Sequence, residues 1–205
     1  MKSQLFYEDD YIMKKAFLLA SILFISVIST ACINNFAVQE LNSKAKEFMD
    51  KGDYVSAIER LKSSVDLDGS VFETRYNLAV AYTQAEDYEN AVSAYKEAMK
   101  LNPDFADTYY SLAVCQENLA KDIISGEIIV DENNVLKKTD IEEETDKKVL
   151  TDNSLNLLTE LLNDAVLNYN LYLEKSNAAD KDEINSKVEE LNELLKEHKN
   201  VSVSR

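Results

Sequence analysis

Similar residues recur along this chain at a fixed distance of 34 positions. Ala45, Ala79 and Ala113 follow one another at this distance. The same spacing separates further pairs, namely Phe48 and Tyr82, Tyr54 and Tyr88, Ala57 and Ala91, Leu61 and Tyr95, Leu67 and Leu101, and Gly69 and Pro103. A period held at so many positions predicts a structural unit that is copied along the chain and stacked on its neighbours.

The composition favours helices as the repeated element. Only one Pro and three Gly occur in 205 residues, whereas a β-sandwich or barrel needs turn residues at regular intervals. Within a copy, small residues such as Ala79 and Ala91 allow two antiparallel helices to approach closely. Tyr82 and Tyr95 are large enough to fill the space between one hairpin and the next. Pro103 cannot continue a helix, so it marks the boundary between two copies.

The clearest copy occupies residues 72–105. It contains Tyr76-Asn77-Leu78-Ala79, Tyr82, Asp87-Tyr88, Ala91, Tyr95, Ala98 and Leu101-Asn102-Pro103. This segment closely resembles the tetratricopeptide repeat, a helix–turn–helix unit with the same period. The copy at residues 38–71 is more divergent, since it has Ser64 and Gly69 where the family prefers Ala and Pro. The resemblance implies an all-α, tetratricopeptide-like solenoid of about three repeats with a C-terminal capping helix.

The third copy is interrupted. Residues 106–119 are predicted to form its first helix, but the second-helix pattern returns only with Ala165 and Tyr169. We therefore predict the second helix at residues 156–178 and an acidic insertion at residues 120–155. Alternatively, residues 156–198 form a separate helical pair.

Two further features concern the insertion and the end of the chain. A solvated loop is the favoured prediction for the insertion, with a small β-hairpin around a turn at residues 131–133 as the alternative. Residues 180–199 place apolar side chains at helical spacing and polar ones opposite, which predicts the capping helix. These apolar residues are Ile184, Val188, Leu191 and Leu195.

Residues 1–31 are predicted to be a secretory signal peptide. Met13-Lys14-Lys15 precedes an apolar run that ends in small residues at Thr30 and Ala31. The acidic residues at positions 8–10 are unusual in the basic start of such a peptide, so translation is predicted to start at Met13.

The end of this segment, Ile28-Ser29-Thr30-Ala31-Cys32, resembles the bacterial lipobox, although Ser29 stands where a branched apolar residue is usual. The resemblance implies that Cys32 is lipidated and becomes the mature N-terminus. Residues 32–37 would then be a short tether, with a reach of roughly 15–20 Å if extended. Ordinary cleavage after Ala31, or an uncleaved signal anchor at residues 16–33, remain alternatives. Ile33 lacks the Asp that retains some lipoproteins at the inner membrane, which favours the outer membrane.

The formal net charge is −16. Such a surface repels nucleic-acid phosphates and anionic lipid head groups. We therefore expect no nucleic-acid partner, and we expect membrane attachment through a hydrophobic group.

The resemblance also implies a binding site. In the family, the first helix of each repeat lines a concave groove, which suits a peptide or an amphipathic helix from another protein. The ligand-contacting positions fall on Asn42, Lys46, Met49, Tyr76, Val80, Thr83, Tyr110, Val114 and Glu117. Alternatively, Tyr76 and Tyr110 simply pack between adjacent repeats. Because Lys46 is the only cation in this set, we do not predict the family's clamp for a terminal carboxylate.

Catalysis is not expected. The sequence has no phosphate-binding Gly loop, nucleophile elbow or Cys/His metal pattern. Cys115 is predicted to be a small buried residue, and His198 and residues 142–144 to be solvated. We therefore predict a lipid-anchored adaptor or assembly factor of the bacterial cell envelope that is not an enzyme and needs no metal or cofactor. The alternative is a structural envelope protein that self-associates through its repeats or its insertion.

Overall fold

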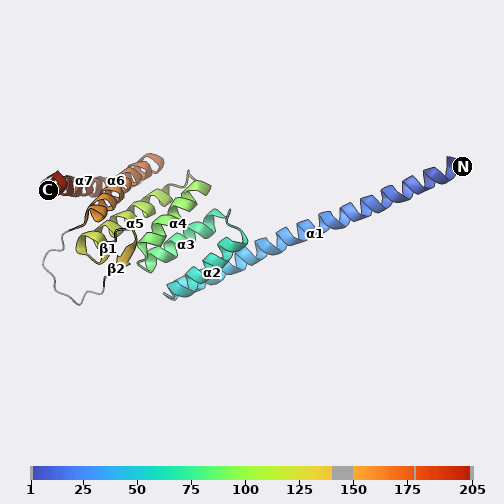
Figure 1. The fold of residues 1–205 in the computed structure, drawn as a ribbon, viewed down its shortest axis with the longest axis horizontal. Helices are drawn as coiled ribbons and strands as arrows, with labels where there is room; N and C mark the ends of the chain where they lie inside the picture. Colours follow the sequence, from blue (N-terminus) through green and yellow to red (C-terminus); the bar gives the residue numbers. More distant parts are fainter. Residues whose placement is uncertain (1, 140–149, 178, 204–205) are drawn as a thin grey trace.

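A computed structural model describes the backbone of residues 2–139, 150–177 and 179–203, and the side chains of residues 13–21, 34–139, 150–177 and 179–198. Consecutive helices run antiparallel and stack in the order of the sequence (Figure 1). The elements are α1 (Lys2–Asp50), α2 (Tyr54–Leu67), α3 (Phe72–Gln84), α4 (Tyr88–Leu101), α5 (Ala106–Ser125), β1 (Ile128–Val130), β2 (Leu136–Lys138), α6 (Asp152–Lys175) and α7 (Lys181–Val203).

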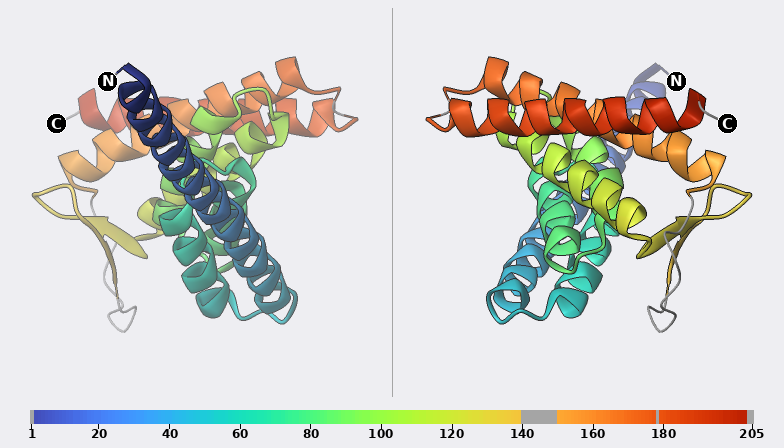
Figure 2. Two further views of the ribbon diagram at one scale, coloured as in Figure 1. Left: turned by 90° about the vertical axis from the view of Figure 1, so that its right-hand side faces the viewer. Right: turned by 90° about the vertical axis from the view of Figure 1, so that its left-hand side faces the viewer.

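Three helical hairpins form the stack. α1 pairs with α2, α3 with α4 and α5 with α6, while α2 packs on α3 and α4 on α5. α7 lies along α6 and closes the end of the stack (Figure 2). Its apolar residues Ile184, Leu191 and Leu195 are buried, and its other face is polar. The predicted all-α solenoid with a capping helix is confirmed.

Alanine residues at the repeated positions hold the helices close together, as predicted. Each is at most 1% exposed, and together they are Ala45, Ala57, Ala79, Ala91, Ala113 and Ala165. Tyr95 and Tyr169 are buried in the cores of the second and third hairpins. The residues that carry the period therefore contribute directly to the core.

The turns within the first two hairpins repeat as closely as the helices do. Gly52 and Glu86 occupy equivalent positions, and both have a positive φ, of 75° and 56°. The next residue, Asp53 or Asp87, caps the second helix by accepting a hydrogen bond from a backbone N–H three residues later. Glycine adopts a positive φ without steric cost, whereas Glu86 is strained there.

The third hairpin differs in its bounds from the prediction. α5 does not end at residue 119 but continues to Ser125, because Ala120 and Ile123 extend its buried face. Gly126, with a φ of 81°, ends the helix. α6 spans Asp152–Lys175 rather than residues 156–178, and it packs on α5. α6 is thus the second helix of the interrupted repeat and not part of a separate pair.

The insertion contains a β-hairpin. β1 and β2 pair antiparallel, with Ile128 opposite Lys138 and Val130 opposite Leu136. The solvated loop, which was the favoured prediction, is therefore wrong for this part. The physical reason is that Ile128 and Val130 are buried in the core formed by α5, α6 and α7. Residues 140–149, including the acidic run at 142–144, lie outside the described residues.

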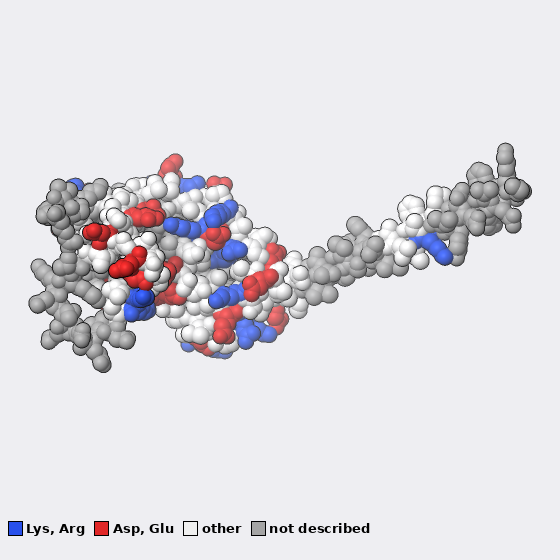
Figure 3. Space-filling model, in the orientation of Figure 1, with Lys and Arg blue, Asp and Glu red and all other residues white. Residues whose placement is uncertain are grey.

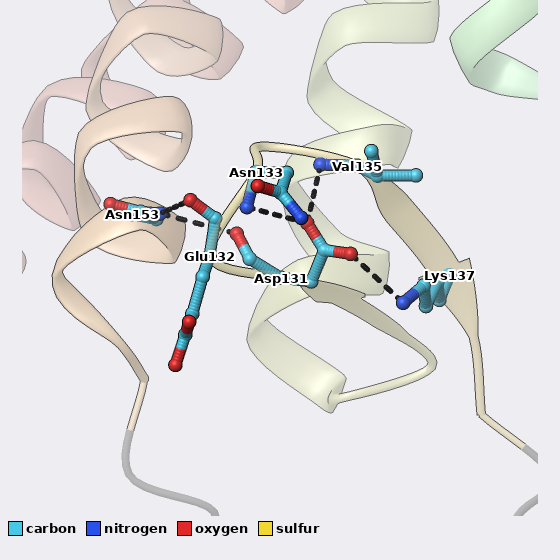
Figure 4. A network of polar contacts seen from close by, with 6 residues as sticks. All are labelled: Asp131, Glu132, Asn133, Val135, Lys137 and Asn153. Atoms are coloured by element: carbon cyan, nitrogen blue, oxygen red, sulfur yellow. Dashed lines mark hydrogen bonds and ion pairs between the residues drawn. The ribbon is translucent and has the colours of Figure 1, made fainter.

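Asp131 organises the hairpin turn (Figure 4). Its Oδ1 atom accepts hydrogen bonds from the backbone N–H groups of Asn133 and Val135, at 2.8 and 3.0 Å. Its Oδ2 atom pairs with Lys137 Nζ at 2.8 Å. From α6, the Asn153 side chain donates to the Asp131 carbonyl at 3.1 Å, which ties the turn to the stack.

The first helix is longer than predicted. α1 is continuous from Lys2 to Asp50, and its first half projects away from the repeats (Figure 1). The backbone at residues 32–37 is helical, so this segment is shorter than its extended reach. Because a helix rises 1.5 Å per residue, Cys32 lies about 9 Å along the axis from Val38, the first buried residue of the stack. Among the residues described, no helical stretch is both long and apolar enough to cross a membrane.

Candidate functional site

The first helices of the three repeats lie side by side. Asn42 of α1 hydrogen-bonds Thr74 of α3 at 2.8 Å, and Thr83 of α3 contacts Cys115 Sγ of α5 at 3.2 Å. α1, α3 and α5 therefore form one continuous surface. We call this surface the first-helix face. It is defined by the predicted site residues that are at least partly exposed and make no side-chain hydrogen bond within the described chain. These residues are Lys46, Met49, Tyr76, Val80, Tyr110 and Val114.

Tyr76 packs between repeats and still reaches the surface. Its ring lies 5.8 Å from that of Phe72, 5.4 Å from that of Phe105 and 5.7 Å from that of Tyr95. These contacts join α3 to α4 and to the start of α5. The side chain is half-buried, and its hydroxyl has no hydrogen-bond partner among the described residues.

Tyr110 repeats this arrangement one unit later. Its ring lies 5.8 Å from that of Tyr169 and 5.2 Å from that of Tyr172, both on α6. Burial raises the pKa of the Tyr110 phenol, and the negative charges of Glu183 and Asp180 raise it further. The start of α7 therefore contributes acidic groups close to the first-helix face. The alternative prediction, that Tyr76 and Tyr110 pack between adjacent repeats, describes the contact of Tyr76 with Phe105 at the start of α5, but the Tyr110 ring contacts α6 of its own repeat.

Asn42 does not belong to the open surface. Its amide donates to the Val38 carbonyl at 2.9 Å, to Ser64 Oγ at 2.9 Å and to Thr74 Oγ1 at 2.8 Å. Ser64 and Thr74 are fully buried. This polar latch joins α1, α2 and α3, and it explains why Ser64 replaces the Ala that the family prefers.

Glu117 is also turned inward, and only 6% of the residue is exposed. Tyr169 donates to its carboxylate at 2.7 Å, and Lys121 pairs with it at 2.5 Å. Burial opposes ionisation, but these two hydrogen bonds outweigh it, so the pKa of Glu117 is lowered. Lys187 of α7 also favours the charged form. Glu117 is thus an internal carboxylate that joins three helices.

Thr83 is the third of the predicted residues with an internal role, since its hydroxyl donates to the Ala79 carbonyl at 2.8 Å and contacts Cys115. Cys115 is buried, as predicted, and burial raises the pKa of its thiol to about 11. A thiol with such a pKa is a poor nucleophile. Within the described side chains, no group of three or more His, Cys, Asp or Glu residues is placed to hold a metal ion.

Sequence reasoning missed the partner of Gly69. Arg75 Nε donates to the Gly69 carbonyl at 2.8 Å, and a Cβ atom at Gly69 would lie 3.0 Å from Arg75 Nη2. The guanidinium therefore occupies the space that a side chain would need, which explains a glycine where the family prefers Pro. The only signal in the sequence was that Gly69 stands where the family prefers Pro.

Comparisons with known proteins agree with this geometry. The family model described as TPR repeat matches residues 81–119, which run from α3 into α5. No curated protein matches the chain. Many solved structures do, at low sequence identity.

Three of these structures are TPR domains. The first TPR of Spaghetti (RPAP3), bound to the HSP90 peptide SRMEEVD, is 18% identical, with a TM-score of 0.52 over 77% of this chain and 92% of that one. The second TPR domain of human RPAP3, in complex with the HSP70 peptide SGPTIEEVD, is 16% identical, with a TM-score of 0.53 over 76% and 98%. The Arabidopsis OM64 TPR domain is 11% identical, with a TM-score of 0.53 over 76% and 96%. The chain therefore has the fold of a tetratricopeptide-type α-solenoid, and one segment of it matches the TPR repeat itself.

Proposed function

We propose that this chain is a lipid-anchored protein-interaction module of the bacterial cell envelope, which binds a partner peptide or helix on the first-helix face. The observation that carries the proposal is the continuity of this face across three stacked helices, with half-buried tyrosines that present rings and free hydroxyls together. Such amphipathic side chains favour contact with another protein. The two RPAP3 domains in complexes with heat-shock-protein peptides support a peptide as the ligand.

The N-terminal sequence supports the membrane anchor. The lipobox-like residues 28–32 favour cleavage before Cys32 and acylation of its thiol. Two acyl chains on one lipidated cysteine give stable anchoring, whereas a single chain binds only marginally. The helical backbone from Cys32 onward would hold the repeats about 9 Å from the lipid, with no flexible linker between them. Ile33 favours the outer membrane as the destination.

The anchor is tested by growing bacteria that express the full chain with an alkyne-bearing palmitate. We expect label on the wild-type chain and on Cys115→Ala, and none on Cys32→Ala. Equal labelling of Cys32→Ala would refute acylation at this residue.

The binding surface is tested by co-purification from the same cells. Met49→Gln and Val80→Gln replace apolar residues of the first-helix face, whereas Val55→Gln on α2 and Leu167→Gln on α6 make the same kind of change at exposed positions elsewhere. We expect the first pair to lose a partner that the second pair retains, with thermal unfolding showing that all four variants fold. Retention of every partner by the first pair would contradict the proposal, and recovery of only a second copy of the chain would favour self-association.

A further inference from the structure

Carboxylates line one end of the first-helix face. Glu73 in the first turn of α3 and Asp107 in the first turn of α5 occupy equivalent positions in consecutive repeats, and both are exposed. Asp180 and Glu183 lie at the start of α7, which packs on α6, and α6 supplies the two rings that contact Tyr110. Both carboxylates raise the pKa of Tyr110, so they lie on the same side of the stack as its phenol. We call these four residues the acidic row.

The acidic row has no cation of its own. In the part of the chain that the structure describes, none of its carboxylates forms an ion pair or a side-chain hydrogen bond. The nearby cations are engaged elsewhere: Arg75 donates to the Gly69 carbonyl at 2.8 Å, and Lys175 pairs with Asp104 at 3.6 Å. Lys187 acts on the internal Glu117. Lys181 is exposed at the start of α7, but three acids surround it at positions 180, 182 and 183, so this end stays negative.

Each acidic-row residue on α3 and α5 is followed by a tyrosine one helical turn later. Residues three apart lie on the same side of a helix, so Glu73 accompanies Tyr76 and Asp107 accompanies Tyr110. The two helices therefore present the same pair of groups, a carboxylate and a phenol hydroxyl that no described residue engages. The complementary group is a cation rich in hydrogen-bond donors, which is a Lys ammonium or an Arg guanidinium.

The stacking of the helices sets the spacing of these cations. Packed helices lie about 8–10 Å apart, and the 3.2 Å contact between Thr83 and Cys115 shows that α3 and α5 are packed. An extended chain rises about 3.3 Å per residue, so three residues cover the distance between the helices.

We propose that the partner segment bound on the first-helix face is basic and extended, with a Lys or Arg at about every third residue. This inference rests on the proposed function and specifies its ligand. Its charge is opposite to that of the peptides in the two RPAP3 complexes, whose sequences end in Glu-Glu-Val-Asp.

Acids in the first turn of a helix also stabilise the helix dipole, whether or not a ligand binds. Glu89 provides the matched control, because it is an exposed first-turn acid on α4, which is not a first helix. A substitution at Glu89 removes the dipole contribution and leaves the acidic row intact.

The experiment measures fluorescence anisotropy with the full chain in a non-ionic detergent. The probe is a labelled nonapeptide of three Lys-Ser-Val units, compared with three Glu-Ser-Val units and with a peptide of the first composition whose three lysines are adjacent. We expect the periodic basic peptide to bind at least tenfold more tightly than the acidic one, more tightly than the clustered one, and more weakly as salt is raised. Glu73→Gln and Asp107→Asn are each expected to weaken its binding by roughly two- to fivefold, the range for an exposed ion pair, and Glu89→Gln to leave it unchanged.

The inference is wrong if none of the three peptides binds, or if the acidic peptide binds as tightly as the periodic basic one. It is also wrong if clustering the lysines has no effect on binding, or if Glu89→Gln weakens binding as much as Asp107→Asn does. Its failure is distinguishable from that of the proposed function. If Met49→Gln and Val80→Gln still lose a cellular partner while the peptides show no such preference, the interaction surface stands and only its basic ligand is refuted.

Discussion

Replacing Glu86 by glycine should stabilise the protein. Glu86 ends the turn between α3 and α4 with a φ of 56°, in the position that Gly52, with a φ of 75°, occupies between α1 and α2. A residue with a Cβ atom costs about 1–2 kcal/mol in this left-handed conformation. Glycine loses roughly 0.5–1 kcal/mol more backbone entropy on folding. The midpoints of these two ranges give an expected net gain of about 0.75 kcal/mol from Glu86→Gly.

The reverse change at Gly52 isolates the backbone contribution. A Cβ atom added at Gly52 meets nothing within 4 Å, so any loss in Gly52→Ala comes from its positive φ and not from a clash. We expect Gly52→Ala to destabilise the protein by about 1 kcal/mol. Glu86→Ala removes the charge and keeps the Cβ atom, so it should reproduce little of the gain from Glu86→Gly.

Urea unfolding followed by circular dichroism measures these differences in the free energy of unfolding. In thermal unfolding, a change of 1 kcal/mol should shift the melting temperature by roughly 2–4 °C for a chain of this size. Gln84→Gly, at the end of α3, is the control for an added glycine in a helix and should be destabilising. If Glu86→Gly is neutral or destabilising, or if Glu86→Ala gains as much, strain at this turn is refuted.

Three further changes test the internal contacts. Asn42→Leu should cost about 1–3 kcal/mol in urea unfolding, because it leaves the two buried hydroxyls of the polar latch with only their 3.5 Å contact to each other. Tyr169→Phe removes a hydrogen bond to the buried Glu117 carboxylate and should cost a similar amount in the same assay. A negligible loss of stability would contradict the burial of this hydrogen bond. The hairpin turn should loosen in acid: the hydrogen bond from Lys137 and those from the backbone lower the pKa of Asp131 from 3.8 to about 2. Its stabilising effect is thus present above about pH 4 and lost as the pH falls towards 2, which amide exchange across the turn would show in the wild-type chain but not in Asp131→Asn.

The stack could be predicted because its signals are local and repeated. The period in alanine and tyrosine gave the helix pairs, and a single amphipathic pattern gave α7. The insertion was harder because Ile128 and Val130 form too short an apolar run to predict burial. What buries them is the surface of α5, α6 and α7, which is assembled from residues far away in the sequence.

The first-helix face followed from the repeat, but the environment of each side chain did not. Asn42 bonds Ser64 and Thr74, which lie 22 and 32 residues away, and Glu117 is bonded by Tyr169, which lies 52 residues away. No local pattern indicates such partners. A position in the repeat therefore predicts which face a polar residue lies on, and not whether another helix engages it.

The binding role of the first-helix face is tested most directly by photo-crosslinking in growing cells. A photoreactive amino acid would replace Val80 or Val114 on this face, or Leu167, which is 56% exposed on α6. We predict that the two valine positions capture the same partner protein and that the Leu167 position does not. Crosslinks from Leu167 alone, or none from either valine position, would contradict a binding site on the first helices.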